Sequence, residues 1–310
     1  MSLNWIAYTL TALGIFLVLI IAFSWLFARW WCKPKKVPSS KTPANYGMSY
    51  ETIEFTSNRT LIKGWFLPVA SNPSLPPVVV LMHGWSRNAS ELLQFAGLLN
   101  KAGFAALLFD ARGHGSSGDD GPITIRKFEE DILAGIDYLE KRTDVDTKRI
   151  GLFGRSIGGA SAILAAASDW RIGALASCSA FADPEALTKD TLRMFHLPSW
   201  PLAWIACRFI ERWLGIGMEQ VAPKNQIGRI DAPMLLIHGE KDSYIKPSNM
   251  EILQARASRH AERLLIPGRG HSDVMRDPLC TREIVSFFDR NLRPDQNQVA
   301  SITLQGVESW

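Results

Sequence analysis

The first pattern that stands out in the sequence is an apolar stretch from Ile6 to Phe27 that contains no charged residue. As a helix with a rise of 1.5 Å per residue it would be about 33 Å long, enough to cross the hydrocarbon core of a bilayer. The pattern predicts a transmembrane helix rather than the buried helix of a soluble core. Large aromatic residues, which favour membrane interfaces, stand near both ends of the stretch: Trp5 and Tyr8 at one, and Trp25, Trp30 and Trp31 at the other.

A cleaved signal peptide is the main alternative to a permanent anchor. A signal peptide carries its positive charge before the apolar run and ends at a cleavage site of small residues. Here the positive charge follows the run, and the segment 28–32 (Ala-Arg-Trp-Trp-Cys) is a poor cleavage site. We therefore expect an uncleaved, single-pass anchor. Because basic residues tend to remain in the cytoplasm, the domain that follows is predicted to lie on the cytoplasmic side, with the N-terminus outside.

Beyond residue 48, stretches typical of strands alternate with stretches typical of helices. Alternating apolar and polar positions at Tyr50–Thr56 and Leu61–Leu67 predict two half-buried strands joined by a turn. Short apolar runs predict further strands, those at 78–82 and 104–109 covered on both faces, and helical spacing predicts the elements between them. This order predicts an α/β fold with a mostly parallel sheet and helices on both faces. The expected strands are 78–82, 104–109, 149–153, 173–177, 234–238 and 264–266, and the helices are 91–101, 125–141, 157–167 and 278–291.

Residues 181–226 break this alternation. The stretch lies between two predicted strands, is rich in tryptophan and is too long for a simple crossover, so we expect an inserted helical cap. An ordinary crossover helix with a long loop is the alternative. The predicted organisation is an anchor with its basic flank at 1–32, a linker at 33–48, an α/β domain at 49–293 with its cap at about 181–226, and a polar tail at 294–310.

The charge of the chain is concentrated at one end. Residues 1–41 contain five basic residues and no acidic one, so a formal net charge of +4 leaves a balance of −1 for the rest of the chain. A nucleic-acid-binding protein would need basic residues grouped on its folded body, so no nucleic-acid partner is expected. The four cysteines are widely spaced and form no disulfide or zinc pattern, which suits a reducing compartment.

The strongest chemical signal is the segment Gly154-Arg155-Ser156-Ile157-Gly158, a GxSxG motif between a predicted strand and a predicted helix. Such an elbow forces its serine into a strained, exposed conformation, and the flanking glycines avoid a clash there. The backbone N–H of Ile157, at the helix start, would point to the place where an oxyanion forms. Ser156 is therefore the candidate nucleophile.

A serine nucleophile needs a base and an acid that orients the base. Asp242 follows one predicted strand, and His271 follows the last one. In this order of nucleophile, acid and base, each on a loop at a strand end, residues of about 50–293 resemble the α/β-hydrolase family. The resemblance implies a Ser156–His271–Asp242 triad. Glu240 and Asp273 are the alternative acids.

Two further segments resemble the same family. His83-Gly84-Trp85 follows the strand at 78–82, where the family places its oxyanion loop, so the resemblance implies the N–H of Trp85 as the partner of Ile157. His83 itself is expected to be structural. Asp110-Ala111-Arg112-Gly113-His114-Gly115 resembles the turn after the family's next strand. The combination is most similar to serine aminopeptidases, acylglycerol lipases and Bem46-like hydrolases.

Two competing signals are weaker. The segment 113–118 (Gly-His-Gly-Ser-Ser-Gly) satisfies the GxGxxG dinucleotide fingerprint, but a loop follows it instead of a helix. Asp119, Asp120 and Asp131 lack the spacing of metal ligands, and we interpret them as solvated residues. No cofactor and no metal ion are therefore expected.

Together these patterns predict a membrane-anchored serine hydrolase that acts through an acyl-enzyme on a small-molecule or lipid-like carboxylic ester. The aromatic residues of the predicted cap, together with the anchor, suggest a lipid or acyl ester; the alternative is that these residues only pack the cap. A serine peptidase or aminopeptidase, an acyltransferase and a non-catalytic scaffold with the same fold are the alternatives.

Overall fold

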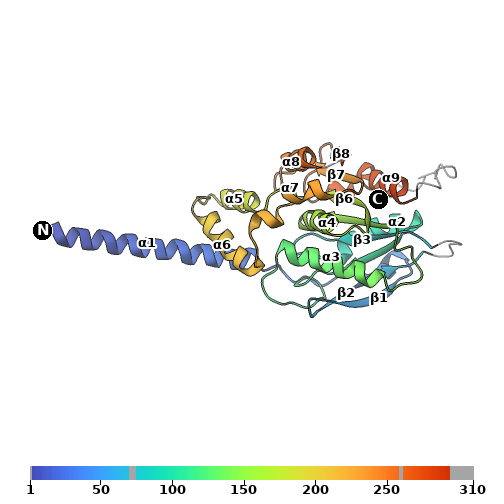
Figure 1. Cartoon of the computed structure of the whole chain (residues 1–310), viewed down its shortest axis with the longest axis horizontal. Helices are drawn as coiled ribbons and strands as arrows, with labels where there is room; N and C mark the ends of the chain where they lie inside the picture. Colours follow the sequence, from blue (N-terminus) through green and yellow to red (C-terminus); the bar gives the residue numbers. More distant parts are fainter. Residues whose placement is uncertain (1, 70–74, 258–260, 294–310) are drawn as a thin grey trace.

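The computed structural model describes residues 2–69, 75–257 and 261–293. In this part of the chain an eight-stranded sheet has the order β1-β2-β4-β3-β5-β6-β7-β8 (Figure 1). The pairs β1–β2 and β2–β4 are antiparallel, and all pairs from β4 to β8 are parallel. The strands are β1 (Glu51–Ser57), β2 (Thr60–Leu67), β3 (Val78–Met82), β4 (Ala105–Phe109), β5 (Ile150–Arg155), β6 (Ile172–Cys178), β7 (Met234–Gly239) and β8 (Ala261–Ile266).

Helices cover both faces of the sheet, so the central strands are apolar throughout. In β3, Val78, Val80 and Met82 face one hydrophobic core, and Val79 and Leu81 face the other. Helices α2 (Leu93–Lys101) and α9 (Pro278–Leu292) pack on one face. Helices α3 (Ile125–Leu139), α4 (Ile157–Ser168) and α8 (Ser248–Arg256) pack on the other.

The predicted α/β architecture is confirmed, and most of the predicted strands and helices differ from the observed ones by only one or two residues. Two differences stand out. The expected helix at 91–101 begins as the short 3₁₀ helix η2 (Ala89–Leu92), whose Asn88 cap accepts the N–H of Ser90. Helix α8 was not predicted, because only Met250 and Leu253 of its nine residues are buried and no apolar periodicity results.

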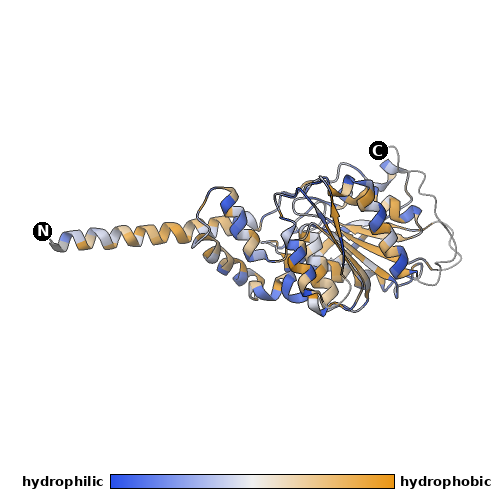
Figure 2. Ribbon diagram, turned by 90° about the horizontal axis from the view of Figure 1, so that it is seen from above, coloured by the Kyte–Doolittle hydropathy of each residue, from blue (hydrophilic) through white to orange (hydrophobic). Residues whose placement is uncertain are grey.

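Helix α1 (Ser2–Trp31) projects from the body as a long apolar rod (Figures 1 and 2). Over Asn4–Trp31 it is long and apolar enough to cross a membrane, with a mean hydropathy of 2.5 in its most apolar window. Most of its side chains are exposed. Near the body, however, Ser24, Phe27 and Ala28 are buried. Most of the helix is therefore exposed, and its C-terminal end packs against the body.

The segment between β6 and β7, which breaks the alternation of strands and helices, folds into helices. Helices α5 (Pro184–Met194) and α6 (Leu202–Leu214) lie beside the end of α1 that joins the body, and α6 packs against α1 (Figure 1). The short helices η3 (Met218–Val221), α7 (Pro223–Gln226) and η4 (Ile227–Arg229) lead to β7. Residues 33–48 contain one short 3₁₀ helix, η1 (Pro43–Tyr46). The expected tail at 294–310 lies outside the described residues.

Candidate active site

The GxSxG segment forms the sharp turn that its sequence predicts. Ser156 lies between β5 and α4 with φ 57° and ψ −123°, a region that residues other than glycine rarely occupy. The turn requires very close backbone approach. A Cβ atom at Gly154 would lie 2.2 Å from the carbonyl oxygen of Gly158, and one at Gly158 would lie 2.4 Å from that of His83. Glycine at these two positions therefore lets α4 begin directly against β3 and β5.

A histidine and an aspartate from two distant loops meet this serine. His271 Nε2 lies 3.1 Å from Ser156 Oγ, and His271 Nδ1 lies 2.7 Å from Asp242 Oδ2. The other oxygen of Asp242 accepts the backbone N–H groups of Tyr244 and Ile245. The ring of Tyr244 stands edge-on to the imidazole, with centroids 5.3 Å apart. These distances suit proton transfer from a hydroxyl to an imidazole that a carboxylate orients.

The Asp242 carboxylate is held in its charged form. Its burial alone would raise its pKa, but hydrogen bonds from His238 and His271 and the N–H of Ile245 outweigh burial and hold the pKa well below its usual range. His238, which is itself buried, also binds the carbonyl of Ile245 at 2.7 Å. From its buried position at the end of β7, His238 thus holds the loop that carries Asp242 in place.

The two alternative acids have other partners. Glu240 accepts the N–H of Gly268 at 2.8 Å, and Asp273 accepts the N–H of Gly270 at 2.8 Å. Both carboxylates thus fix the backbone of the loop that carries His271. Of the three acids considered, the structure brings only Asp242 to the imidazole.

The segment His83-Gly84-Trp85 lies beside Ser156 at the end of β3. A methyl group on Gly84 would lie 3.6 Å from the Cβ atom of Ser156. His83 is fully buried: its Nε2 accepts the N–H of Ala111 at 3.0 Å, and its Nδ1–H donates to the carbonyl of Gly84 at 2.8 Å. These two contacts fix the neutral tautomer, and burial lowers the pKa of this imidazole. His83 therefore shapes the loop, as expected from the sequence.

The two backbone N–H groups expected to stabilise an oxyanion have no acceptor among the described residues. Ile157 is the first residue of α4, where no carbonyl of the same helix can accept its N–H. Trp85 lies in the turn that the hydrogen bond from the N–H of Arg87 to the carbonyl of Gly84 closes. Two unused donors beside a serine hydroxyl can bind a negatively charged oxygen, and one such donor is typically worth about 3–4 kcal/mol in a transition state.

An ion pair beside the elbow was not predicted from the sequence. Arg155 donates to the carboxylate of Glu91 and, at 2.6 Å, to the backbone carbonyl of His271. Glu91 in turn accepts the N–H of Gly84. The pair thus joins the serine turn, the His271 loop and the Gly84 turn, three segments far apart in sequence. The only sequence signal was a charged residue next to the nucleophile in an otherwise apolar strand.

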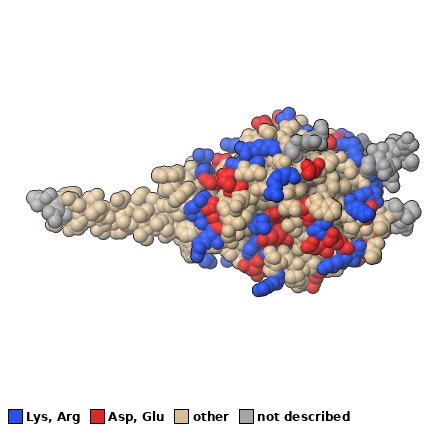
Figure 3. All heavy atoms as spheres, viewed as in Figure 1, with Lys and Arg blue, Asp and Glu red and all other residues tan. Residues whose placement is uncertain are grey.

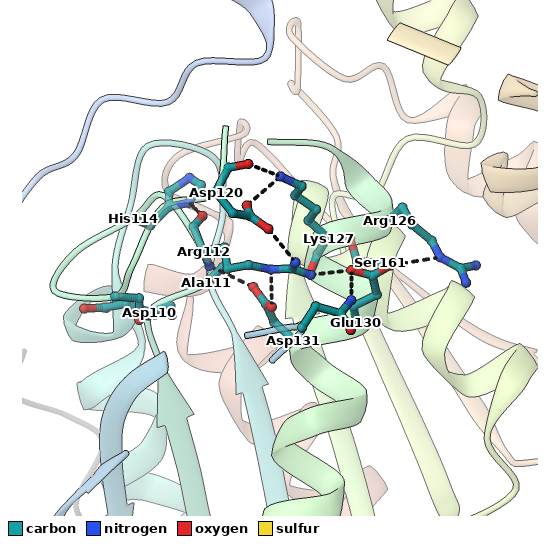
Figure 4. A network of polar contacts seen from close by, with 12 residues as sticks. Asp110, Ala111, Arg112, His114, Asp120, Arg126, Lys127, Glu130, Asp131 and Ser161 are labelled. Carbon is teal, nitrogen blue, oxygen red and sulfur yellow. Dashed lines mark hydrogen bonds and ion pairs between the residues drawn. The ribbon is translucent and has the colours of Figure 1, made fainter. Parts of the chain in front are cut away.

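A second polar network fixes the loop that follows β4 (Figure 4). Arg112 is buried, and its Nε and backbone N–H both donate to Asp131 at 2.7 Å. Asp120 and Glu130 bind the other nitrogens of the guanidinium. The expectation that Asp131 would be solvated is wrong, because this side chain is buried against Arg112. Asp120 and Asp131 thus serve as partners of an arginine.

The GxGxxG segment lies within the same loop. Gly113 N–H donates to the carbonyl of Gly118, and helix α3 begins only at Ile125. A dinucleotide fingerprint instead leads directly into a helix whose N-terminus faces the phosphates. In this chain the glycines close a turn.

Ser156 opens into an apolar cavity that is partly open to solvent, with about 730 Å³ of space between the protein atoms and the adjoining solvent. The described residues that line the cavity include no charged side chain. They come from the serine turn and Trp85, the segment before α3, helices α5 and α6, the loop after β7 and the end of α1: Trp31, Cys32, Trp85, Ile123, Thr124, Ile125, Ser156, Ile157, Phe181, Pro184, Leu187, Thr188, Ile210, Leu214, Met218, Tyr244 and Ile245.

Comparison with known proteins agrees with this geometry. The model of the serine aminopeptidase S33 family matches residues 74–215. The Bacillus subtilis protein YqkD is 32% identical over 196 residues, which cover 62% of this chain and 63% of YqkD. YfhR of Escherichia coli K12 is 28% identical over 253 residues, 79% of this chain and 83% of YfhR. The alignment with YqkD therefore spans slightly less than two thirds of that relative.

Solved structures share the fold. The Pyrococcus furiosus esterase Pf2001 superposes with a TM-score of 0.68 and 23% identity, over 84% of this chain and 98% of the esterase. Est1E from Butyrivibrio proteoclasticus, solved with ferulic acid bound, gives 0.60 and 21%, over 77% and 98%. Together with the sheet order and the serine turn, these similarities show that the chain has the α/β-hydrolase fold.

Replacing Arg155 with Met should remove the contact that holds the His271 loop while keeping the side-chain length. A displacement of about 1 Å in a reacting group can cost around 100-fold in rate, so we expect Ser156 to react with a fluorophosphonate at least tenfold more slowly. Arg87→Met is the matched control, because the exposed Arg87 also contacts Glu91, at 3.7 Å, and does not reach His271. Equal rates for both variants would contradict a positioning role for Arg155.

Proposed function

We propose that this protein is a membrane-anchored serine hydrolase that cleaves carboxylic esters through Ser156, His271 and Asp242. The observation that carries the proposal is the unbroken chain of contacts from Ser156 Oγ through His271 to Asp242. A free hydroxyl is a weak nucleophile at neutral pH, and an adjacent base held in one tautomer makes it a strong one. The two unused N–H groups of Trp85 and Ile157 support the same reaction.

The reaction proceeds in two steps. Ser156 Oγ attacks the ester carbonyl carbon while His271 Nε2 takes the hydroxyl proton. The carbonyl oxygen becomes an oxyanion at the N–H groups of Trp85 and Ile157. Collapse of the tetrahedral intermediate breaks the ester C–O bond, and the departing alcohol takes the proton from His271.

Water completes the cycle. His271 removes a proton from a water molecule that attacks the acyl group on Ser156. The second tetrahedral intermediate releases the carboxylic acid, and the proton returns to Ser156 Oγ. Asp242 remains ionised throughout and stabilises the imidazolium that forms in each step, as its low pKa allows. An alcohol in place of this water would make the same site an acyltransferase.

The apolar cavity favours an ester with an apolar acyl group over an aminopeptide substrate. An aminopeptidase recognises a free ammonium group, which needs a carboxylate in the pocket. Among the described residues that line the cavity there is none. Chains of methylene groups suit such a lining.

The long helix α1 supports membrane anchoring. Its apolar surface is exposed over most of its length, and exposed apolar patches of this size are rare in soluble monomers. On the face drawn in Figure 3, lysine and arginine side chains, with some acidic ones among them, lie at the end of the body from which the helix leaves. By the positive-inside tendency we place this body in the cytoplasm.

Replacing Ser156 with Ala should abolish both ester hydrolysis and labelling by a fluorophosphonate, because no other hydroxyl takes the position opposite His271 Nε2. The assay uses the full chain in detergent micelles with p-nitrophenyl esters and gel detection of the label. A non-catalytic scaffold would give no labelling of the unaltered chain either. Undiminished labelling of Ser156→Ala would refute the assignment of the nucleophile.

Replacing Asp242 with Asn should lower kcat by about 10³–10⁴-fold with little change in KM, because an amide cannot hold the His271 tautomer that accepts the serine proton. Glu240→Gln is the matched control, since Glu240 contacts only the backbone of Gly268 in this region. If Glu240→Gln lost more activity than Asp242→Asn, the acid would have been assigned wrongly.

Orientation can be measured by protease protection. With the body in the cytoplasm, trypsin added to intact spheroplasts should leave it uncut, and lysis should expose it to cleavage. Cleavage of the body in sealed spheroplasts that retain a cytoplasmic marker would reverse the proposed orientation.

A further inference from the structure

The end of helix α1 belongs to the cavity of the candidate active site. Trp31 and Cys32 line the same cavity as Ser156. Cys32 is only 4% exposed, and its carbonyl accepts the N–H of Ile123, another residue that lines the cavity, at 2.8 Å. The helix therefore supplies part of the pocket wall in addition to its exposed apolar rod.

The transition from pocket wall to exposed rod is abrupt. Leu26 is 58% exposed, yet it lies only about 7.5 Å along the helix axis from Trp31. Phe27 and Ala28, between them, are buried against the body. A molecule in contact with Leu26 is thus little more than one helical turn from the wall of the cavity that contains Ser156.

The connection between α5 and α6 forms an apolar rim beside this transition. Met194, Phe195 and Trp200 are exposed, and Trp200 is 78% exposed. The ring of Phe195 contacts that of Trp30 on α1, with centroids 5.9 Å apart. Figure 1 shows this connection reaching along α1 away from the sheet. Exposed tryptophan beside a membrane-length helix is typical of a segment that lies in the bilayer interface.

Basic side chains accompany this rim. Arg208 and Arg212 stand on the exposed face of α6 in line with Trp204, and Arg208 lies over the Trp204 ring at 5.9 Å. Arg29 lies over Trp25 at 4.9 Å on α1. Arginine side chains paired with tryptophan suit the headgroup region of an anionic leaflet.

We propose that α1 is a wall of the acyl-binding pocket, and that the substrate is a membrane amphiphile whose acyl chain lies against Trp31 and Cys32, between α1 and α6. This inference rests on the proposed ester hydrolysis at Ser156. The chain of the amphiphile passes from the bilayer past the rim of α5 and α6 into the cavity, and its ester carbonyl reaches Ser156. The same helix thus anchors the protein and selects its substrate.

The test uses the full chain in detergent micelles and two esters, p-nitrophenyl acetate and p-nitrophenyl dodecanoate. For the unaltered chain, kcat/KM should rise about twofold to fourfold for each methylene that enters the cavity. Cys32→Trp fills the cavity at the α1 wall. It should lower kcat/KM for the dodecanoate at least tenfold more than kcat/KM for the acetate. Leu26→Trp, on the exposed part of the same helix, should leave both esters within twofold.

A second variant keeps the proposal testable if Cys32→Trp does not fold. Trp31→Ala enlarges the pocket at the same wall and should raise activity toward branched or longer acyl esters relative to the acetate. Fluorophosphonate labelling of Ser156 reports whether each variant retains its site. Equal loss for both esters in Cys32→Trp, or no change in chain-length preference in either variant, would overturn the proposal. A lack of hydrolysis and labelling in the unaltered chain would instead refute the proposed function itself.

Discussion

The geometry of this protein depends on the close approach of the first turn of α4 to strands β3 and β5. Only glycine at positions 154 and 158 permits this approach, since a Cβ atom at Gly158 would overlap the His83 carbonyl. The contact forces Ser156 into its positive φ and turns the Ile157 N–H toward the same space. It also brings the turn at Gly84 beside the serine. One steric constraint thus places the hydroxyl and two backbone donors together.

The remaining parts of the site are held by polar contacts between loops. Arg155 and Glu91 tie the His271 loop to the Gly84 turn, and Asp131 on α3 holds Arg112 and the loop that contacts His83. These ions are buried or half-buried, and each has a partner of opposite charge, as such positions require. The carboxyl edge of the sheet is therefore a continuous network rather than a set of independent loops.

Much of the fold could be predicted because its signals are local. Short apolar runs reveal buried strands, and GxSxG between a strand and a helix reveals the elbow. Ser156, Asp242 and His271 could be grouped because each follows a strand and parallel strands end at one edge. The Arg155–Glu91 pair, the burial of Asp131 and the place of Cys32 in the cavity could not be predicted. Each depends on which distant segments meet, and although a charged residue in the apolar strand before Ser156 indicates a partner for Arg155, a single sequence does not show which residue that partner is.

The hydrogen bond between Cys32 and Ile123 has a mechanical consequence. The last turns of α1 are packed into the body, so the end of the helix is held directly against the part of the chain that carries Ser156. With α1 in a bilayer, the helix then sets the height of Ser156 above the leaflet and the orientation of the body relative to the membrane. Such an enzyme would meet its substrates by lateral diffusion in its own leaflet. A change in bilayer thickness would then change the distance between Ser156 and the membrane surface.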